Sequence, residues 1–149
     1  MPNKGVRPHF SLHERLAADC FVLGDFPLCR LLLMNDANYP WFILVPRRAG
    51  AREIYLLDEA DQRRLWAESA QLSRAIMAAY AGEKLNVAAL GNQVPQLHLH
   101  HVVRYAGDAA WPDPVWGKVP AAPYGERPRA ERVAQLRAQG LPGFDWAAP

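Results

Sequence analysis

The sequence predicts an α+β fold in which one antiparallel sheet of about five strands carries one long and one short helix. Its 149 residues fit a single domain. Five short apolar stretches are typical of strands, and one long segment repeats its apolar residues at helical spacing. Half of the residues are apolar and 21% are charged, which is typical of a globular protein and excludes a disordered or collagen-like chain.

The N-terminal part predicts a short helix followed by three strands. Ser11 and Glu14 match a capping box, so we expect Ser11 to cap a helix of about two turns. Three apolar stretches of strand length follow, at residues 20–23, 31–34 and 42–45. Because only short turn segments separate them, we expect an antiparallel meander.

A long helix and two further strands come next. Asp58 matches an N-cap, and Glu59 and Asp61 suit the positive end of a helix dipole. The expected buried face recurs at steps of three and four residues: Leu65, Trp66, Ser69, Leu72, Ile76 and Tyr80. Its aromatic residues are expected in the core, and Glu68 is among the polar residues off this face. Gly82 ends the helix. Strands are then expected at residues 85–90 and 97–104.

The composition changes near the C-terminal part of the chain. Seven of the 13 prolines follow Trp111, and from Gly117 onward five basic residues face three acidic ones. We therefore predict a body at residues 1–116 and a Pro-rich, basic tail at 117–149, with a short helix at about 129–139. The net charge of +2 is too small to indicate a nucleic-acid partner.

Export and membrane insertion are not expected. No run of about 18 apolar residues is present that could span a bilayer. Residues 1–11 lack the apolar stretch of a signal peptide. Cys20 and Cys29 are too few for a disulfide framework or a structural zinc site. We therefore expect a cytoplasmic protein without a membrane partner.

Three of the five histidines lie within four positions, inside the expected strand 97–104. Side chains alternate along a strand, so this segment has two faces. The polar face is expected to hold Gln96, His98 and His100. The core face is expected to hold Leu97, Leu99, His101 and Val103. We therefore interpret His101 as a structural residue and the other two histidines as candidate functional residues.

Two kinds of chemistry use such a histidine pair. His98 and His100 could bind a metal ion, but a closed tetrahedral site needs further ligands, and none lies nearby in the sequence. Alternatively, one imidazole is a nucleophile and the other orients it or holds a substrate oxygen. A histidine is largely neutral at pH 7, so it can attack phosphorus without a separate base.

The segment Gln96-Leu97-His98-Leu99-His100-His101-Val102 resembles the motif His-φ-His-φ-His-φ-φ, with φ apolar, of the histidine triad (HIT) superfamily of nucleotide hydrolases and transferases. The resemblance extends to residues 91–95 and 40–46 and to the pair Trp111-Pro112, and covers roughly residues 9–117. It implies a HIT-like fold for residues 1–116.

The resemblance also implies an activity and a site. His98 would attack the α-phosphate and form a covalent nucleotidyl-histidine, while His100 would hydrogen-bond the phosphate or the leaving group. Asn92 and Gln93 would donate to the phosphates, and Asn35 or Asp36 would hold the ribose hydroxyls. The expected substrate is a dinucleoside polyphosphate or a nucleoside phosphoramidate, with a purine base. No cofactor and no metal are implied, and the protein is expected to be a homodimer.

Two positions depart from the family pattern. Gln96 replaces the first motif histidine, and Trp41 occupies a position where many members carry a further histidine. A carboxamide cannot carry a proton at neutral pH, so Gln96 would position His98 through its ring nitrogen or the adjacent backbone without relaying protons. The alternatives are therefore a catalytically silent nucleotide-binding module or a metal site on His98 and His100.

The aromatic residues after the motif leave two interpretations open. Trp111, Pro112 and Trp116 either pack the tail against its own chain or close over the site of a partner subunit.

Overall fold

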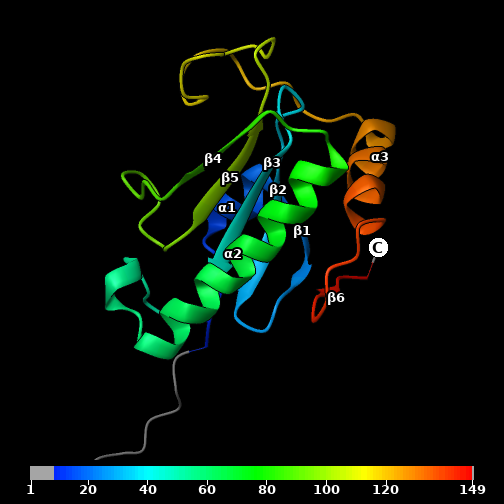
Figure 1. Cartoon of the computed structure of the whole chain (residues 1–149). Coiled ribbons are helices and arrows are strands. Elements are labelled where there is room, and N and C mark those ends of the chain that lie inside the picture. Colours follow the sequence, from blue (N-terminus) through cyan, green and yellow to red (C-terminus); the bar gives the residue numbers. More distant parts are fainter. Residues whose placement is uncertain (1–8, 149) are drawn as a thin grey trace, which may run out of the picture.

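The computed structural model describes residues 9–148 and contains one six-stranded sheet in the order β4-β5-β3-β2-β1-β6 (Figure 1). All neighbouring strands are antiparallel. The predicted α+β class is confirmed, and within the described residues a sixth strand adds to the elements expected. The segment 1–8, on which most of the signal-peptide expectation rests, lies outside the described residues.

The elements follow one another in the predicted order. Their bounds are α1 Glu14–Asp19, β1 Cys20–Asp25, β2 Cys29–Met34, β3 Trp41–Pro46, η1 Ile54–Leu56, α2 Glu59–Ala79, β4 Lys84–Ala88, β5 Leu99–Arg104, α3 Glu126–Arg137 and β6 Asp145–Trp146. Asp58 caps α2 as predicted, because its carboxylate accepts a hydrogen bond from the backbone N–H of Asp61 at 2.7 Å. None of the described helices is long and apolar enough to cross a membrane.

The sheet is covered on both faces, and each face has its own apolar core. Long helix α2 runs across one face (Figure 1). The core beneath it includes Leu31, Leu33, Phe42, Leu65, Leu72, Ile76, Leu99 and Leu136. The core of the opposite face includes Leu16, Leu32, Trp41, Ile43, Val102 and Val115. Successive residues of β2, β3 and β5 thus enter opposite cores, as strand alternation requires.

Short helix α1 begins later than the capping box predicts. Its N-cap is His13, whose ring Nδ1 accepts a hydrogen bond from the backbone N–H of Arg15 at 3.1 Å. The capping role predicted for Ser11 is therefore wrong. The backbone carbonyl of Ser11 instead accepts a hydrogen bond from the side chain of Gln96, which holds the segment just before the helix.

The tail of the chain is packed on the same sheet. Helix α3 lies at Glu126–Arg137, close to the expected 129–139, and its Leu136 is fully buried in the core beneath α2. Strand β6 pairs with β1 at Gly24 and Asp25. A Cβ at Gly24 would lie 2.2 Å from the carbonyl oxygen of Asp145, so this close approach of two strands requires a glycine. The domain boundary at residue 117 stays a prediction.

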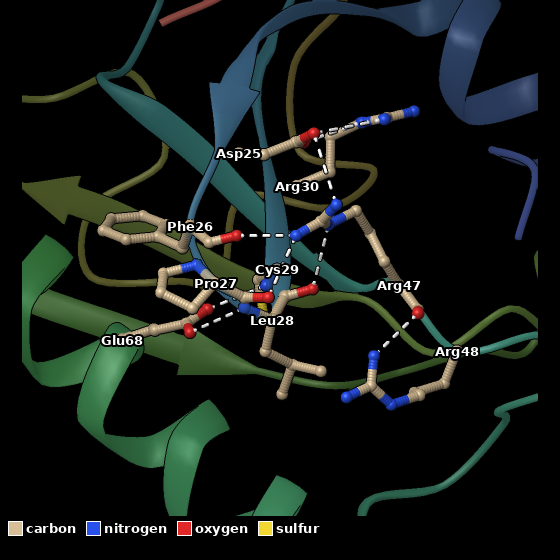
Figure 2. A network of polar contacts seen from close by, with 9 residues as sticks. All are labelled: Asp25, Phe26, Pro27, Leu28, Cys29, Arg30, Arg47, Arg48 and Glu68. Atoms are coloured by element: carbon tan, nitrogen blue, oxygen red, sulfur yellow. Dashed lines mark hydrogen bonds and ion pairs between the residues drawn. The ribbon is translucent and has the colours of Figure 1, made fainter. Parts of the chain in front are cut away.

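Two expectations about α2 are corrected. Tyr80 is buried as expected, but Trp66 is 50% exposed and lies at the margin of the buried face. Glu68, expected off that face, is only 4% exposed. Its two carboxylate oxygens accept hydrogen bonds from the backbone N–H groups of Leu28 and Cys29 at 2.9 and 2.8 Å (Figure 2). A buried polar group needs such partners, and these amides supply them.

Arg47 completes this network from the other side of the β1–β2 turn. Its guanidinium donates to the carbonyl oxygens of Phe26, Pro27 and Leu28 at 2.9–3.2 Å (Figure 2). The turn is therefore held by a carboxylate of α2 on its N–H groups and by the guanidinium of Arg47, one residue after β3, on its carbonyls.

We predict that Glu68→Gln lowers the free energy of unfolding by about 1–3 kcal/mol, because the carboxamide N–H₂ would face a backbone N–H and leave it unpaired. Urea unfolding followed by circular dichroism measures the change. Glu59→Gln, on the exposed first turn of the same helix, is the control and should change stability by less than about 1 kcal/mol. Equal effects of the two substitutions would contradict the role given to Glu68.

Candidate active site

His98 lies one residue before β5, and the backbone sets the position of its proton. Ring Nδ1 is 2.7 Å from the carbonyl oxygen of Gln96. A carbonyl can only accept a hydrogen bond, so Nδ1 carries a proton, and in the neutral ring Nε2 keeps its lone pair. The residue is 7% exposed and lines a cavity. The unprotonated Nε2 is the atom that a nucleophilic histidine uses.

His100 has the opposite proton arrangement. Its Nδ1 accepts a hydrogen bond from the indole N–H of Trp41 at 3.0 Å, so the ring proton is on Nε2. Burial, reinforced by the neighbouring rings of His98 and His101, lowers the pKa of His100 to about 3. The centroids of the His98 and His100 rings are 4.8 Å apart. The pair therefore consists of one ring with a free lone pair and one neutral ring with an N–H donor.

The histidine pair lines one of two adjoining cavities. The first has a volume of about 310 Å³ and brings together His98, His100, Asn92 and Gln93, four of the seven predicted site residues. The second, of about 430 Å³, is lined by the predicted ribose residues Asn35 and Asp36. Both cavities share the lining residues Asp19, Met34 and Trp116. The second cavity therefore adjoins the one that the histidine pair lines.

Asn35 and Asp36 also hold the tail against this space. The side-chain oxygen of Asn35 accepts a hydrogen bond from the backbone N–H of Tyr124 at 2.8 Å. Asp36 Oδ1 accepts from the backbone N–H groups of Asn38 and Ala122. Residues 115–123 consequently form one wall of the second cavity.

Trp116 belongs to that wall and packs against the site of its own chain. Its ring centroid lies 5.1 Å from that of His100 and 5.7 Å from that of Trp41. Of the two interpretations left open by the sequence, packing within the chain therefore describes Trp116. Trp111 lies elsewhere, beside the guanidinium of Arg104 at 5.6 Å.

The side chain of Gln96 anchors the segment that leads into α1. Strand β5 begins only at Leu99, so Gln96 and His98 both lie outside the strand, and the placement of Gln96 on the histidine face stays a prediction. The carboxamide accepts from the backbone N–H of His13 and donates to the carbonyl of Ser11, both at 2.8 Å. Only its backbone carbonyl contacts His98, which is one of the two routes expected for positioning that ring.

Helix α1 contributes cavity residues that the sequence did not indicate. Arg15 and Asp19 line the cavity and form an exposed ion pair at 3.9 Å. The position of α1 depends on Gln96, more than 80 residues away along the chain, so no local pattern marks this helix as a wall of the site.

His101 faces the α2 side, as alternation predicts, and both of its ring nitrogens have partners. Nδ1 donates to the carbonyl of Leu99 at 3.0 Å, and Nε2 accepts from the hydroxyl of Ser69 at 2.8 Å. Burial lowers the pKa of His101 to about 4, although the hydrogen bond to Leu99 opposes this shift.

Metal-ligating side chains do not gather around the histidine pair. Within residues 9–148, no group of three or more His, Cys, Asp or Glu side chains is arranged to hold a metal ion. Cys20 and Cys29 are both buried free thiols, and they lie in different cores.

The fold is an α+β fold with one antiparallel sheet, and two spaced histidines enter a cavity beside a polar loop. These features are typical of a histidine triad protein. The chain belongs to the HIT domain family, because the model of that family matches residues 15–107, more than half of the sequence. Membership supports a nucleotide-binding or nucleotide hydrolase or transferase role.

Solved structures show the same relationship. The chain is 57% identical to a histidine triad protein from Marinobacter aquaeolei VT8, with 89% of this chain and 96% of that one covered and a TM-score of 0.86. It is 47% identical to one from Bradyrhizobium japonicum, with 89% and 98% covered and a TM-score of 0.87. A hypothetical histidine triad nucleotide-binding protein from Sulfolobus tokodaii strain7 shares the fold at 15% identity, with 80% and 83% covered and a TM-score of 0.62. A search of curated proteins returned no match.

We predict that stability falls as the pH is lowered from about 6.5 toward 4. Histidines of the unfolded chain take up protons below about 6.5, while folded His100 and His101 stay neutral down to about 3 and 4. The unfolded state then binds more protons, so each histidine removes up to about 1.4 kcal/mol per pH unit, and its contribution is complete above pH 6.5. Urea unfolding between pH 7.5 and 4.5 measures the slope.

His101→Gln removes one of these two groups and should reduce the slope by about half. His9→Gln, at an exposed position, is the control and should leave the slope unchanged. A wild-type stability that does not vary over this pH range would contradict the neutral, buried state of the two rings.

Proposed function

We propose that the protein is a nucleotide hydrolase or nucleotidyl transferase that cleaves at the α-phosphate through a covalent nucleotidyl-histidine on His98. The observation that carries this proposal is the hydrogen bond from His98 Nδ1 to the Gln96 carbonyl. It leaves the Nε2 lone pair free on a ring that lines the cavity, next to a second ring that carries an N–H donor.

The proposed reaction has two displacement steps. In the first, Nε2 of His98 attacks the α-phosphorus, a P–N bond forms, and the bond to the leaving group breaks with its electron pair on the departing atom. In the second, water or the hydroxyl of another acceptor attacks the same phosphorus and releases its proton to the solvent, and the P–N electron pair returns to Nε2. The Nε2–H group of His100 donates to the oxygen that gains negative charge, a position where a preorganised donor stabilises the transition state.

The remaining cavity residues suit the rest of a nucleotide. Asn92 and Gln93 would donate to the phosphates, and Asn35 or Asp36 would meet the ribose hydroxyls in the adjoining cavity. A purine nucleoside phosphate derivative, such as a dinucleoside polyphosphate or a phosphoramidate, is therefore the proposed substrate. The proposed location is the cytoplasm, and no cofactor is needed for these steps.

A catalytically silent nucleotide-binding module is the second candidate. Gln96 favours this candidate, because its side chain holds the N-terminal segment and provides no titratable proton to the site. A metal site on His98 and His100 is a third. Turnover of a nucleotide panel that survives a chelator supports the first proposal, tight binding without turnover the second, and chelator-sensitive turnover the third.

We predict that His98→Ala lowers kcat by about 1,000-fold or more while nucleotide binding persists, because the substitution removes the proposed nucleophile. His100→Ala should lose less, since transition-state hydrogen bonding is removed but the nucleophile remains. His9→Ala, an exposed histidine outside the cavities, is the matched control with unchanged activity.

Trapping of nucleotide labelled at the α-phosphate tests the intermediate directly. The label should be acid-labile and base-stable, and it should be absent from His98→Ala. Label on His100 or His101, or full activity of His98→Ala, would exclude the proposed mechanism.

We also propose a twofold homodimer formed through β4 and α2. Among the described residues β4 is an edge strand, and the exposed apolar side chains Val87 and Trp66 lie beside that edge. Two contacts bring them near each other. Val87 pairs with His101, and the ring of His101 contacts Ser69. Ser69 lies on α2 about one helical turn after Trp66. An exposed strand edge with apolar neighbours is a common dimer surface.

Light scattering of the wild type should therefore give about twice the chain mass of 16.7 kDa. Val87→Lys with Trp66→Glu should shift the mass to that of the monomer. Val22→Lys, at a similarly exposed apolar residue on β1, should leave the dimer intact. A monomeric wild type at micromolar concentration would refute the assembly.

A further inference from the structure

Trp41 is the residue that determines which nitrogen of His100 carries the proton. It lies on β3, next to β5, and its indole N–H is 3.0 Å from Nδ1 of His100. Both side chains are buried, at 5% and 4% exposed. An indole N–H only donates, so Nδ1 of His100 must act as an acceptor for as long as this contact persists.

This contact limits what His100 can do during a reaction. Its Nε2–H can donate a hydrogen bond, but a neutral imidazole does not release that proton near neutral pH. To act as a general acid, the ring would first have to become an imidazolium, which burial and the rings of His98 and His101 disfavour. An imidazolium would also place an Nδ1–H against the indole N–H of Trp41.

No other group that lines the described cavity beside His100 can supply a proton to a leaving group. Trp116 packs against the ring without a titratable group, and Arg15 lines the cavity but remains protonated. Asp19 lines the cavity from α1 as an exposed carboxylate paired with Arg15. The proton of His98 Nδ1 is held by the Gln96 carbonyl and points away from the nucleophilic Nε2.

We propose that Trp41 makes His100 a neutral hydrogen-bond donor and not an acid, and that the site therefore prefers phosphoanhydrides to phosphoramidates. This proposal rests on the proposed nucleotidyl transfer to His98. In an anhydride, the P–O bond breaks with its electron pair on a phosphate oxygen, which departs as a stable anion without taking up a proton. In a phosphoramidate, the P–N bond breaks with its electron pair on an amine nitrogen, which must receive a proton as it departs.

The wild-type protein provides the first test. Diadenosine triphosphate and adenosine 5′-phosphoramidate carry the same adenylyl group, so they differ only in what leaves. At pH 7 we expect kcat/KM for the anhydride to exceed that for the phosphoramidate by about 100-fold or more, since a positioned general acid contributes roughly 10²–10⁴-fold. Comparable values would overturn the preference but leave the proposed function standing. Absence of turnover with both substrates would overturn both proposals.

The second test observes the ring proton directly. In protein labelled with ¹⁵N-histidine, the nitrogen shifts of His100 should report a neutral ring with the proton on Nε2 from pH 8 to pH 5. Trp41→Phe keeps an aromatic ring but removes the N–H donor, so the proton should redistribute between the two nitrogens. Trp116→Phe alters the other aromatic neighbour and should leave the proton on Nε2. A wild-type His100 that carries its proton on Nδ1, or that titrates in this range, would refute the role of Trp41.

The third test changes the preference. Trp41→His replaces the donor-only indole with a ring that can exchange a proton, and it should raise phosphoramidate turnover below pH 7 enough to narrow the ratio of kcat/KM values at least about tenfold. Because the readout is a ratio between two substrates, a general loss of stability or activity in the variant does not imitate the effect. An unchanged ratio in a folded Trp41→His protein would contradict the proposal.

Discussion

Side-chain alternation along β5 is the constraint on which the rest of the structure depends. His100 and His101 are adjacent in sequence, so their rings must enter opposite faces of the sheet. Each ring then obtains its own partner, Trp41 on one face and Ser69 on the other. Because both rings are buried, both imidazoles remain neutral, and the hydrogen bonds of each ring decide which of its nitrogens carries the proton.

The end of β5 connects this arrangement to the tail that closes the site. Arg104 is 1% exposed and binds Asp108 at 2.8 Å, and it also donates to Asn86 on β4. Burial alone would raise the pKa of Asp108, but the hydrogen bonds from Arg104 and from three backbone N–H groups lower it to about 2. This charged, hydrogen-bonded pair thus stabilises the first turn after β5, and that turn begins the segment that leads to Trp116. Removing one partner of such a pair is costly, because the other charge stays buried.

The features that the sequence predicted correctly depend on local periodicity, and those it missed depend on distant contacts. The strands, the Asp58 cap and the opposite faces of the two adjacent histidines follow from spacings of two to four residues. Helical periodicity could not show that Glu68 is buried, because its partners are the backbone amides of a turn some 40 residues away. The hydrogen bonds of the Gln96 side chain could not be predicted for a related reason. Its partners, His13 and Ser11, lie 83 and 85 residues earlier in the chain.

The two departures from the family motif change the site in the same physical direction. Gln96 and Trp41 can each form hydrogen bonds, the indole as a donor only, but neither side chain can take up or release a proton at neutral pH. Gln96 supplies its carbonyl to His98 and uses its carboxamide to hold α1, while Trp41 supplies its N–H to His100. In the proposed reaction, such a site orients the nucleophile and stabilises developing charge with neutral donors that need little reorganisation. The rate of that reaction would then depend on how readily the leaving group departs with its electron pair without being protonated, because no titrating residue would protonate it.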